Sequence, residues 1–230
     1  MTDYLFDPAP PVSLPLSGTT VRYPVTRIFC VGRNYAAHAA EMGVEVDHEA
    51  PFYFTKTPAH LVESGTTLAY PPGTAKLHHE MELAFVIGAP VFRADRDRAG
   101  AAIHAYATAL DMTRRDLQDE AKDRRRPWDT GKDFEGSVVL SSLVPATVFT
   151  PGDQRIRLTV NGQGRQEGRL SDMIHDCNGI VAHLSTLYHL APGDLVLTGT
   201  PEGVGPVVAG DRITGQIEGL PDVRLAYSAG

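Results

Sequence analysis

The segment His78-His79-Glu80-Met81-Glu82 carries two carboxylates two residues apart. On a β-strand, residues at this spacing project from the same side, so Glu80 and Glu82 are expected to lie close together. Two such carboxylates repel each other unless a cation lies between them. Asp111 ends another apolar segment and can supply a third carboxylate; with water, the three suit a hard, octahedral ion such as Mg²⁺ or Mn²⁺. A solvated outer face of the strand is the alternative interpretation.

His38 and Glu41 form a second candidate group, three residues apart in a segment that predicts a short helix. Residues at this spacing share one helix face, so the carboxylate can orient the imidazole. A histidine held in this way can act as a general base that takes a proton from water. The alternative is an ordinary ion pair on the surface.

An anionic ligand needs local positive charge here, because the 230-residue chain has a formal net charge of −7. The candidates are basic residues beside turns and strand ends, namely Arg33, Lys56, Arg114, Arg115 and Lys132.

A glycine-rich loop at residues 198–205 can present backbone N–H groups and the Thr200 hydroxyl to a carboxylate, or it can be a purely structural turn. It is not a phosphate-binding loop, because no Gly-Lys-Ser/Thr follows it. The sequence also lacks the Cys/His spacing of a zinc site and the Gly-x-Ser-x-Gly motif of a serine nucleophile.

Periodicity and turn signals predict the elements that position these groups. Alternating apolar residues make residues 80–87 the clearest strand. Asn161-Gly162 after a strand at residues 155–160 predicts a hairpin turn. Further short strands or hairpins are expected at residues 19–23, 27–31, 52–56, 138–144 and 194–198.

Three helices are predicted. The longest covers residues 171–190, with Asp172 as its N-cap and an apolar face. A short one covers residues 34–42, capped by Asn34, and a third covers residues 116–122.

The composition is that of an ordinary globular protein, with 42% apolar and 21% charged residues. The negative net charge argues against binding to nucleic acid or to an anionic membrane, and no apolar run is long enough to cross one. The acidic N-terminus is unlike a signal peptide, and Cys30 and Cys177 are expected to be free, buried thiols. We therefore expect a cytoplasmic protein.

Taken together, the segments resemble the fumarylacetoacetate hydrolase family over about residues 28–217. Several motifs in order make the resemblance specific and favour the functional interpretation of the carboxylates. They are Val31-Gly32-Arg33-Asn34-Tyr35 with His38 and Glu41, His78-His79-Glu80-Met81-Glu82-Leu83, Leu110-Asp111-Met112-Thr113, Arg115-Asp116-Leu117-Gln118-Asp119-Glu120, Trp128, Lys132, Val160-Asn161-Gly162, and Leu197-Thr198-Gly199-Thr200-Pro201-Glu202-Gly203-Val204-Gly205-Pro206.

The resemblance implies an α+β, mostly β fold: a mixed β-sandwich or β-roll flanked by short helices. We expect one catalytic domain at residues 25–230, preceded by an extension at residues 1–24 that packs on the core. Members of the family are commonly homodimers, and the same state is expected here.

The resemblance also implies the roles of individual residues. Mg²⁺, or Mn²⁺ in its place, would bind Glu80, Glu82 and Asp111. The dyad of His38 and Glu41 would lie on a lid within residues 36–50 that is mobile without ligand. Gln118 and Lys132 would stabilise an oxyanion, and the substrate contacts would be Arg33, Tyr35, Lys56, Arg115 and Thr200.

Two details qualify these contacts. Many relatives carry Phe-x-Lys-Pro, whereas Phe54-Thr55-Lys56-Thr57-Pro58 has one residue inserted before the proline, so the loop after Lys56 is expected to differ. One hypothesis is that Arg115 binds the substrate carboxylate that lies farther from the metal.

The activity implied is metal-dependent hydrolysis of a carbon–carbon bond in a small anionic 2,4-dioxo acid. The chain looks most like acylpyruvate hydrolases, which suggests that fumarylpyruvate from the gentisate pathway is cleaved to fumarate and pyruvate. The alternatives within the family are oxaloacetate decarboxylation, hydroxymuconate isomerisation and sugar-acid dehydration. A metal-stabilised binding protein without catalysis is a more remote alternative.

Overall fold

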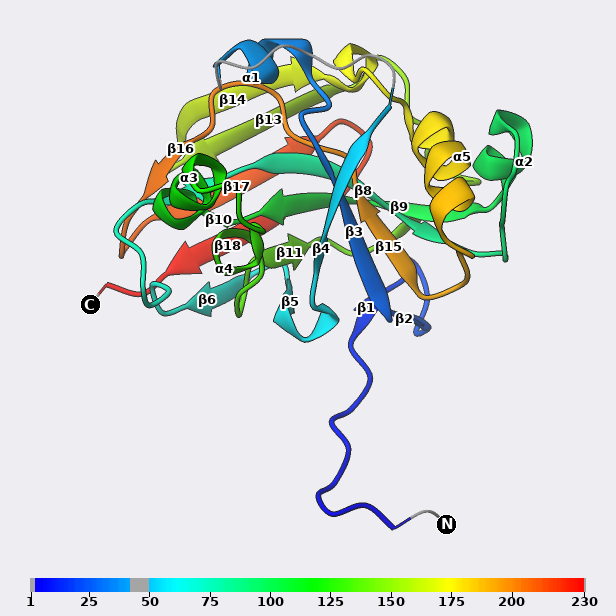
Figure 1. The fold of residues 1–230 in the computed structure, drawn as a ribbon, viewed down its shortest axis with the longest axis horizontal. Helices are drawn as coiled ribbons and strands as arrows, with labels where there is room; N and C mark the ends of the chain where they lie inside the picture. The colour runs from blue at the N-terminus through cyan, green and yellow to red at the C-terminus, as the bar shows by residue number, and fades with distance from the viewer. Residues whose placement is uncertain (1–2, 42–49, 230) are drawn as a thin grey trace.

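The computed structural model describes residues 3–41 and 50–229. The molecule is mostly β, with a curled sheet, a second sheet packed against it and short helices at the edges (Figure 1). The predicted fold class is therefore confirmed.

The largest sheet has eight strands. Its order is β4 (Phe52–Lys56), β3 (Arg27–Gly32), β15 (Asp194–Leu197), β8 (Met81–Ile87), β9 (Ile103–Asp111), β11 (Val138–Leu140) and β5 (Leu61–Glu63), and β12 (Val144–Pro145) also pairs with β9.

The other strands form a five-stranded sheet, a three-stranded sheet and an N-terminal hairpin. The five-stranded sheet has the order β14 (Gln163–Arg169), β13 (Arg155–Val160), β17 (Arg212–Ile217), β18 (Val223–Tyr227) and β6 (Thr66–Leu68); the three-stranded sheet has the order β10 (Thr113–Arg114), β7 (Leu77–His79) and β16 (Gly205–Val207); and the hairpin joins β1 (Ser13–Pro15) to β2 (Arg22–Pro24).

The helices are short and lie around the sheets. They are α1 (Ala36–Glu41), α2 (Arg96–Ala101), α3 (Arg115–Asp123), α4 (Asp129–Lys132) and α5 (Cys177–Leu187), with 3₁₀ turns η1 (Pro58–His60) and η2 (Leu170–Asp172).

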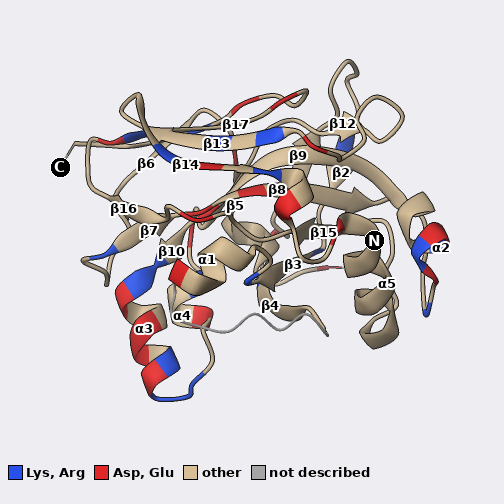
Figure 2. Cartoon of the chain, turned by 90° about the horizontal axis from the view of Figure 1, so that it is seen from above, with Lys and Arg blue, Asp and Glu red and all other residues tan. Residues whose placement is uncertain are grey.

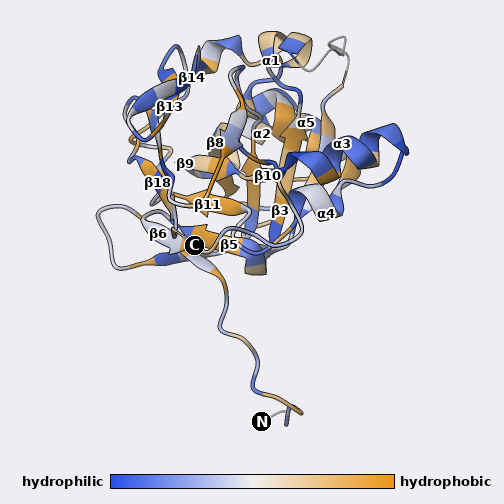
Figure 3. Cartoon of the chain, turned by 90° about the vertical axis from the view of Figure 1, so that its left-hand side faces the viewer, coloured by the Kyte–Doolittle hydropathy of each residue, from blue (hydrophilic) through white to orange (hydrophobic). Residues whose placement is uncertain are grey.

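Both faces of the eight-stranded sheet are buried. One face packs against the five-stranded sheet and α5, in a core that includes Phe85 and Ile156. The other carries small side chains such as Ala84 and Ala107 and is covered by Leu14 of the hairpin. Apolar strands accordingly fill the interior, while α3 is hydrophilic and lies at the edge (Figure 3).

The sheet curls toward the face with the small side chains. Strands β4 and β9 are four places apart, which in a flat sheet would separate them by roughly 19 Å at about 4.8 Å per strand. Yet Lys56 Nζ at the end of β4 lies 2.6 Å from Asp111 Oδ1 at the end of β9. The sheet is therefore a half-barrel, and its concave face opens at the end where these two residues meet.

Most of the predicted strands are present. The predicted strand at residues 138–144 is two short strands, β11 and β12. The strand or hairpin predicted at residues 19–23 overlaps only β2, because the observed hairpin begins earlier, with β1. Asn161 and Gly162 form the β13–β14 turn with φ angles of 52° and 78°, as expected for a two-residue hairpin loop. The helix predicted at residues 116–122 is α3, and Cys30 and Cys177 are free and buried, as predicted.

The longest predicted helix begins later than expected. It starts at Cys177 rather than Ser171, and its N-cap is Asp176, whose side chain accepts a hydrogen bond from the N–H of Gly179. Asp172 instead accepts from the N–H of Arg169 in the preceding turn. Two acidic cap candidates four residues apart cannot be ranked by pattern alone, because the choice depends on the contacts of the segment between them.

The short helix predicted at residues 34–42 is found as α1, and its predicted cap is wrong. The Asn34 amide is used elsewhere: it donates to the carbonyls of His175 and Thr198, and its oxygen accepts from the N–H of His175. Residues 42–49 of the predicted lid, and with them most of the region expected to be mobile, lie outside the described residues.

The N-terminal extension has two parts. The β1–β2 hairpin packs on the half-barrel through Leu14, whereas residues 3–11 are exposed and run away from the body of the molecule (Figure 1). Among the described helices, none is long and apolar enough to span a membrane.

The position of the α5 cap can be tested by mutation. Asp176→Ala should lower the free energy of unfolding by about 1 kcal/mol, because it leaves an N–H at the start of α5 without its acceptor. Asp176→Asn should retain most of this stability, since an amide oxygen also caps and the exposed ion pair with Arg96 contributes little. Chemical denaturation measures both. A larger loss of unfolding free energy in Asp172→Ala than in Asp176→Ala would contradict the assignment of Asp176 as the N-cap of α5.

Candidate active site

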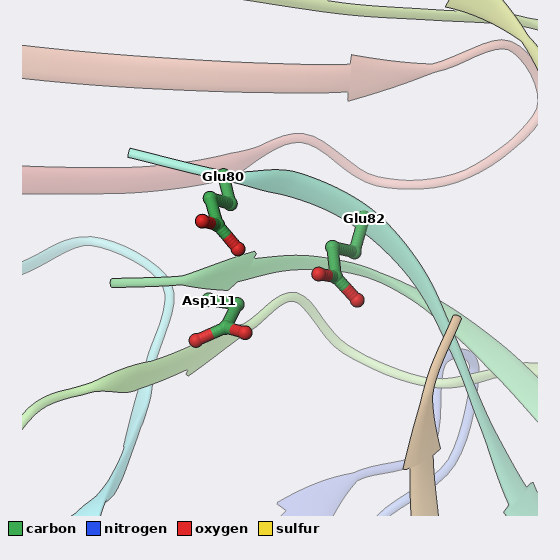
Figure 4. A group of neighbouring side chains, drawn as sticks. All are labelled: Glu80, Glu82 and Asp111. Carbon is green, nitrogen blue, oxygen red and sulfur yellow. The ribbon is translucent and has the colours of Figure 1, made fainter. Parts of the chain in front are cut away.

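Three carboxylates meet at the open end of the half-barrel: Glu80, which precedes β8, Glu82 in β8, and Asp111 at the end of β9 (Figure 4). Pairing of β8 with β9 brings them together, because the N–H of Asp111 donates to the carbonyl of Glu80 at 2.9 Å. One oxygen from each carboxylate lies within 4.8 Å of the others. The predicted cluster is therefore present.

The cluster is buried rather than solvated. Glu80, Glu82 and Asp111 are 5%, 2% and 1% exposed. Glu82 and Ala84 are two residues apart in β8 and lie on the same face, so the acidic face of the strand continues the concave apolar face of the half-barrel. This excludes the alternative of an outer strand face in contact with solvent.

Three buried cations balance the three carboxylates. Lys132 Nζ donates to Glu80 Oε2 at 2.7 Å and to Asp111 Oδ2 at 2.8 Å. Lys56 Nζ contacts the other oxygen of Asp111, and the Arg115 guanidinium donates to Glu80 Oε1. Lys56, Arg115 and Lys132 come from β4, α3 and α4, so distant parts of the chain converge here.

The carboxylates are not electrostatically equivalent. Burial and the neighbouring Asp111 and Glu80 raise the pKa of Glu82 well above its usual range, although the N–H of Gly199 donates to it at 2.7 Å. Burial alone would also raise the pKa of Glu80, but Lys132 and Arg115 outweigh it and lower that pKa. Glu82 is thus the carboxylate whose charge is least compensated by the protein.

These donors fit a divalent cation. Three buried carboxylate oxygens at this spacing, in a cavity that water can enter, match the oxygen-rich coordination of Mg²⁺ and Mn²⁺. A cation beside Glu82 would also supply the positive charge that its surroundings lack.

His38 and Glu41 lie on α1, where His38 is buried and lines the same cavity while Glu41 is exposed. His38 Nδ1 is 3.4 Å from Glu41 Oε2, and the Glu41 carboxylate accepts from the N–H of Gly203. Burial lowers the pKa of His38, although Glu80 and Glu41 act in the opposite direction. The imidazole is therefore neutral near pH 7, the state that a general base requires.

The glycine-rich loop presents backbone N–H groups to carboxylates, as predicted, but these carboxylates belong to the protein. Gly199 donates to Glu82 and Gly203 donates to Glu41. Gly203 has a φ of +87°, and a Cβ there would lie 2.2 Å from the Arg165 carbonyl oxygen, so only glycine fits. Thr200 lines the cavity, and its hydroxyl accepts a hydrogen bond from Gln166 Nε2.

The structure separates the other candidates by location. Arg33, Arg115, Gln118 and Lys132 line the cavity, whereas Lys56 and Tyr35 do not.

Lys56 lies behind Asp111 and donates to the carbonyls of Met112 and Ser137. This geometry favours a role in holding Asp111 rather than the predicted contact with the substrate. Tyr35 is buried, and burial raises the pKa of its hydroxyl.

Two buried amide side chains that support the site were missed as functional residues. Gln166 accepts from the N–H of Met81 and donates to the Thr200 hydroxyl and the Pro201 carbonyl, which ties β8 to the glycine-rich loop. Asn34 ties the same loop to the end of β3. The only signal for Asn34 was its place in the Val31–Tyr35 motif, and Gln166 lies in a strand that is otherwise polar and exposed.

Comparison with known proteins agrees with the fold. The family model described as "Fumarylacetoacetate (FAA) hydrolase C-terminal" matches residues 27–226. The chain belongs to this family, as its motifs predicted.

Among its relatives is a fumarylpyruvate hydrolase from Ralstonia sp, 53% identical over 80% of this chain and 97% of that protein. An oxaloacetate tautomerase from Escherichia coli (strain K12) is 42% identical over 88% of this chain and 93% of its own length. The crystal structure of fumarylpyruvate hydrolase from Pseudomonas aeruginosa in complex with Mn²⁺ and pyruvate superimposes with a TM-score of 0.95 at 42% identity, covering 99% of this chain and 100% of that one.

The metal assignment yields a binding test. Glu82→Gln should weaken Mn²⁺ binding by at least about 100-fold, since even contacts outside the ligand shell are worth roughly 10- to 100-fold. The metal-free variant should be no less stable at neutral pH, because a carboxyl with a raised pKa stabilises the fold only when protonated and loses that contribution as pH rises. Calorimetric titration and thermal unfolding measure the two quantities.

The same raised pKa predicts the direction of the pH dependence. Metal binding to the wild type must displace a proton from Glu82, so affinity should rise with pH, and this dependence should be reduced in Glu82→Gln. Unchanged Mn²⁺ affinity in the variant would contradict the site.

Proposed function

We propose that this chain is a metal-dependent hydrolase that cleaves fumarylpyruvate to fumarate and pyruvate by breaking a carbon–carbon bond of the 2,4-dioxo acid. The observation that carries the proposal is the buried His38 imidazole, which contacts the Glu41 carboxylate and lines the same cavity as the carboxylate cluster. The 53% identity to a fumarylpyruvate hydrolase supports the choice of substrate.

The charge balance favours a dianionic substrate. Glu80, Glu82 and Asp111 are matched by Lys56, Arg115 and Lys132, so a bound divalent cation leaves the site with positive charge. In a chain of net charge −7, this positive region is local and can attract a small dianion. Fumarylpyruvate carries two carboxylates and meets this requirement.

His38 is the group that takes the proton of the attacking water. Glu41 can only accept, so its contact with Nδ1 favours the tautomer protonated there and leaves the lone pair of Nε2 free. Water that gives its proton to Nε2 adds to the C4 carbonyl. The C3–C4 bond then breaks, fumarate is released, and the pyruvyl half leaves as an enolate that takes up a proton to give pyruvate.

A divalent cation, when bound, supplies Lewis acidity that stabilises the developing enolate charge, a contribution of several kcal/mol. The protein must also stabilise the oxyanion at C4, and Gln118 is the better placed donor. Its Oε1 accepts from Arg115, which leaves the Nε2 hydrogens without a partner among the described residues. Lys132 would first have to release one of its three contacts, to Glu80, Asp111 or Thr113.

Oxaloacetate tautomerisation is the second candidate, favoured by the 42% identity to a bacterial oxaloacetate tautomerase. It needs the same 2-oxo acid binding and proton transfer at C3, but no attack by water.

We further propose Mg²⁺ as the cation, a cytoplasmic homodimer as the working form, and the breakdown of aromatic compounds through gentisate as the pathway in which the enzyme acts.

The first experiment is an assay with purified protein and Mg²⁺. Fumarylpyruvate should lose its ultraviolet absorbance while fumarate and pyruvate appear in equal amounts, and chelation of the metal should stop the reaction. Oxaloacetate is assayed in parallel for enol–keto exchange. Exchange of oxaloacetate without cleavage of any acylpyruvate would overturn the hydrolase proposal in favour of the tautomerase.

The dyad predicts a distinct kinetic signature. Glu41→Gln should lower kcat by about 100-fold or more, because a neutral amide neither stabilises the imidazolium nor enforces its tautomer. Mn²⁺ affinity should stay close to that of the wild type, since Glu41 is not in the carboxylate cluster. Steady-state kinetics with calorimetry tests this. A variant with normal kcat would remove Glu41 from the mechanism.

A further inference from the structure

Four side chains form a chain of cation–ring and ring–ring contacts beside the cavity. The Arg33 guanidinium lies 5.8 Å from the Phe52 ring centre, Phe52 meets Trp128 edge-on at 5.1 Å, and Lys122 Nζ lies 5.3 Å from the Trp128 ring. They come from the end of β3, from β4, from the residue before α4 and from α3. The contacts fix two cations at separate points around one aromatic pair.

Both cations face the same cavity as the carboxylate cluster. Arg33, Trp128 and Lys122 line it, together with Glu80 and Glu82. Figure 2 shows α3, which carries Lys122, projecting beside α4 at the side of the molecule. These cations are separate from the ones that balance the carboxylates.

Lys122 has little compensation for its charge. Its only carboxylate neighbour within 4.0 Å in the described part of the chain is Asp119, at 3.9 Å, and Asp119 is equally far from Lys76. Burial and the nearby Arg115 lower the pKa of Lys122, and Arg33 acts in the same direction. A half-buried ammonium beside other cations in a cavity is a site that an anion would stabilise.

Arg115, the earlier candidate for the distal carboxylate, is already engaged. Its guanidinium donates to Glu80 and Gln118, and Nε approaches His78 at 3.4 Å. Arg115 therefore belongs to the end of the cavity that holds the carboxylate cluster, and another cation must receive a second carboxylate farther away.

We propose that Lys122, together with Arg33, binds the distal carboxylate of a linear 2-oxo dioic acid whose 2-oxo end lies at the carboxylate cluster, and that the Trp128 ring packs against the chain between the two ends. This specificity site rests on the proposed function in one respect, namely that the ligand is a 2-oxo acid. Lys122 then selects dioic over monoic acids.

Two ligands of equal length isolate this selection. 2-Oxoheptanedioate and 2-oxoheptanoate both have the 2-oxo acid end, and only the first has a distal carboxylate. Neither has the C4 carbonyl at which the hydrolase would act, so binding to the Mg²⁺-loaded protein can be measured by calorimetry without turnover.

Lys122→Met should weaken binding of the dioate by about tenfold, the size expected for one charge-assisted hydrogen bond, and should leave binding of the monoate nearly unchanged. Lys122→Arg should recover most of the loss. Arg124→Met is the matched control: it removes one positive charge just beyond α3, where Arg124 pairs with Glu120 on the exposed surface, and it should affect neither ligand.

The outcomes separate this proposal from the proposed function. Equal binding of dioate and monoate by the wild type, or equal losses for both in Lys122→Met, would overturn the Lys122 site. A selective loss for the dioate supports it even if fumarylpyruvate is not cleaved, in which case only the hydrolase assignment fails. If fumarylpyruvate is cleaved, Lys122→Met should raise KM for it more than for acetylpyruvate, which lacks the distal carboxylate.

Discussion

The burial of three carboxylates at the end of a half-barrel is the constraint on which the rest of this structure depends. Each buried, unpaired carboxylate would cost several kcal/mol, more than a domain of this size can tolerate three times over. Of the compensating cations, Lys56 comes from a strand, and Arg115 and Lys132 come from two successive helices much later in the sequence. The curl of the large sheet and the packing of α3 and α4 are therefore both needed to bring these cations to the carboxylates.

The glycine-rich loop also links the carboxylate cluster to the dyad of His38 and Glu41. The glycine-rich loop after β15 donates one N–H to Glu82 and another to Glu41, so a single loop positions both. Gln166 and Asn34 hold that loop in turn. A shift of the loop would move the dyad and the cluster together, which explains why buried amide side chains far from each other in sequence converge on it.

The sequence predicted what depends on local pattern. Alternation along residues 80–87 located β8 and the shared side of Glu80 and Glu82, and Asn161-Gly162 located a hairpin. It did not predict contacts set by the curl. Lys56 was expected beside the substrate but lies behind Asp111, because no local signal shows that β4 meets β9 across the half-barrel. Gln166 was missed because it is a buried residue in a strand that is otherwise polar and exposed.

The relatives act on substrates that share one end and differ at the other. Fumarylpyruvate and oxaloacetate both have a 2-oxo acid and an acidic C3, so the carboxylate cluster and Arg115 can serve either. They differ in length, because the second carboxylate of oxaloacetate is C4, whereas fumarylpyruvate has its reactive carbonyl there and its second carboxylate at C7. A cation that selects between them must lie well away from the cluster. Lys122 lines the same cavity as the cluster but contacts the Trp128 ring rather than the cluster carboxylates, so it is a cation that can make this distinction.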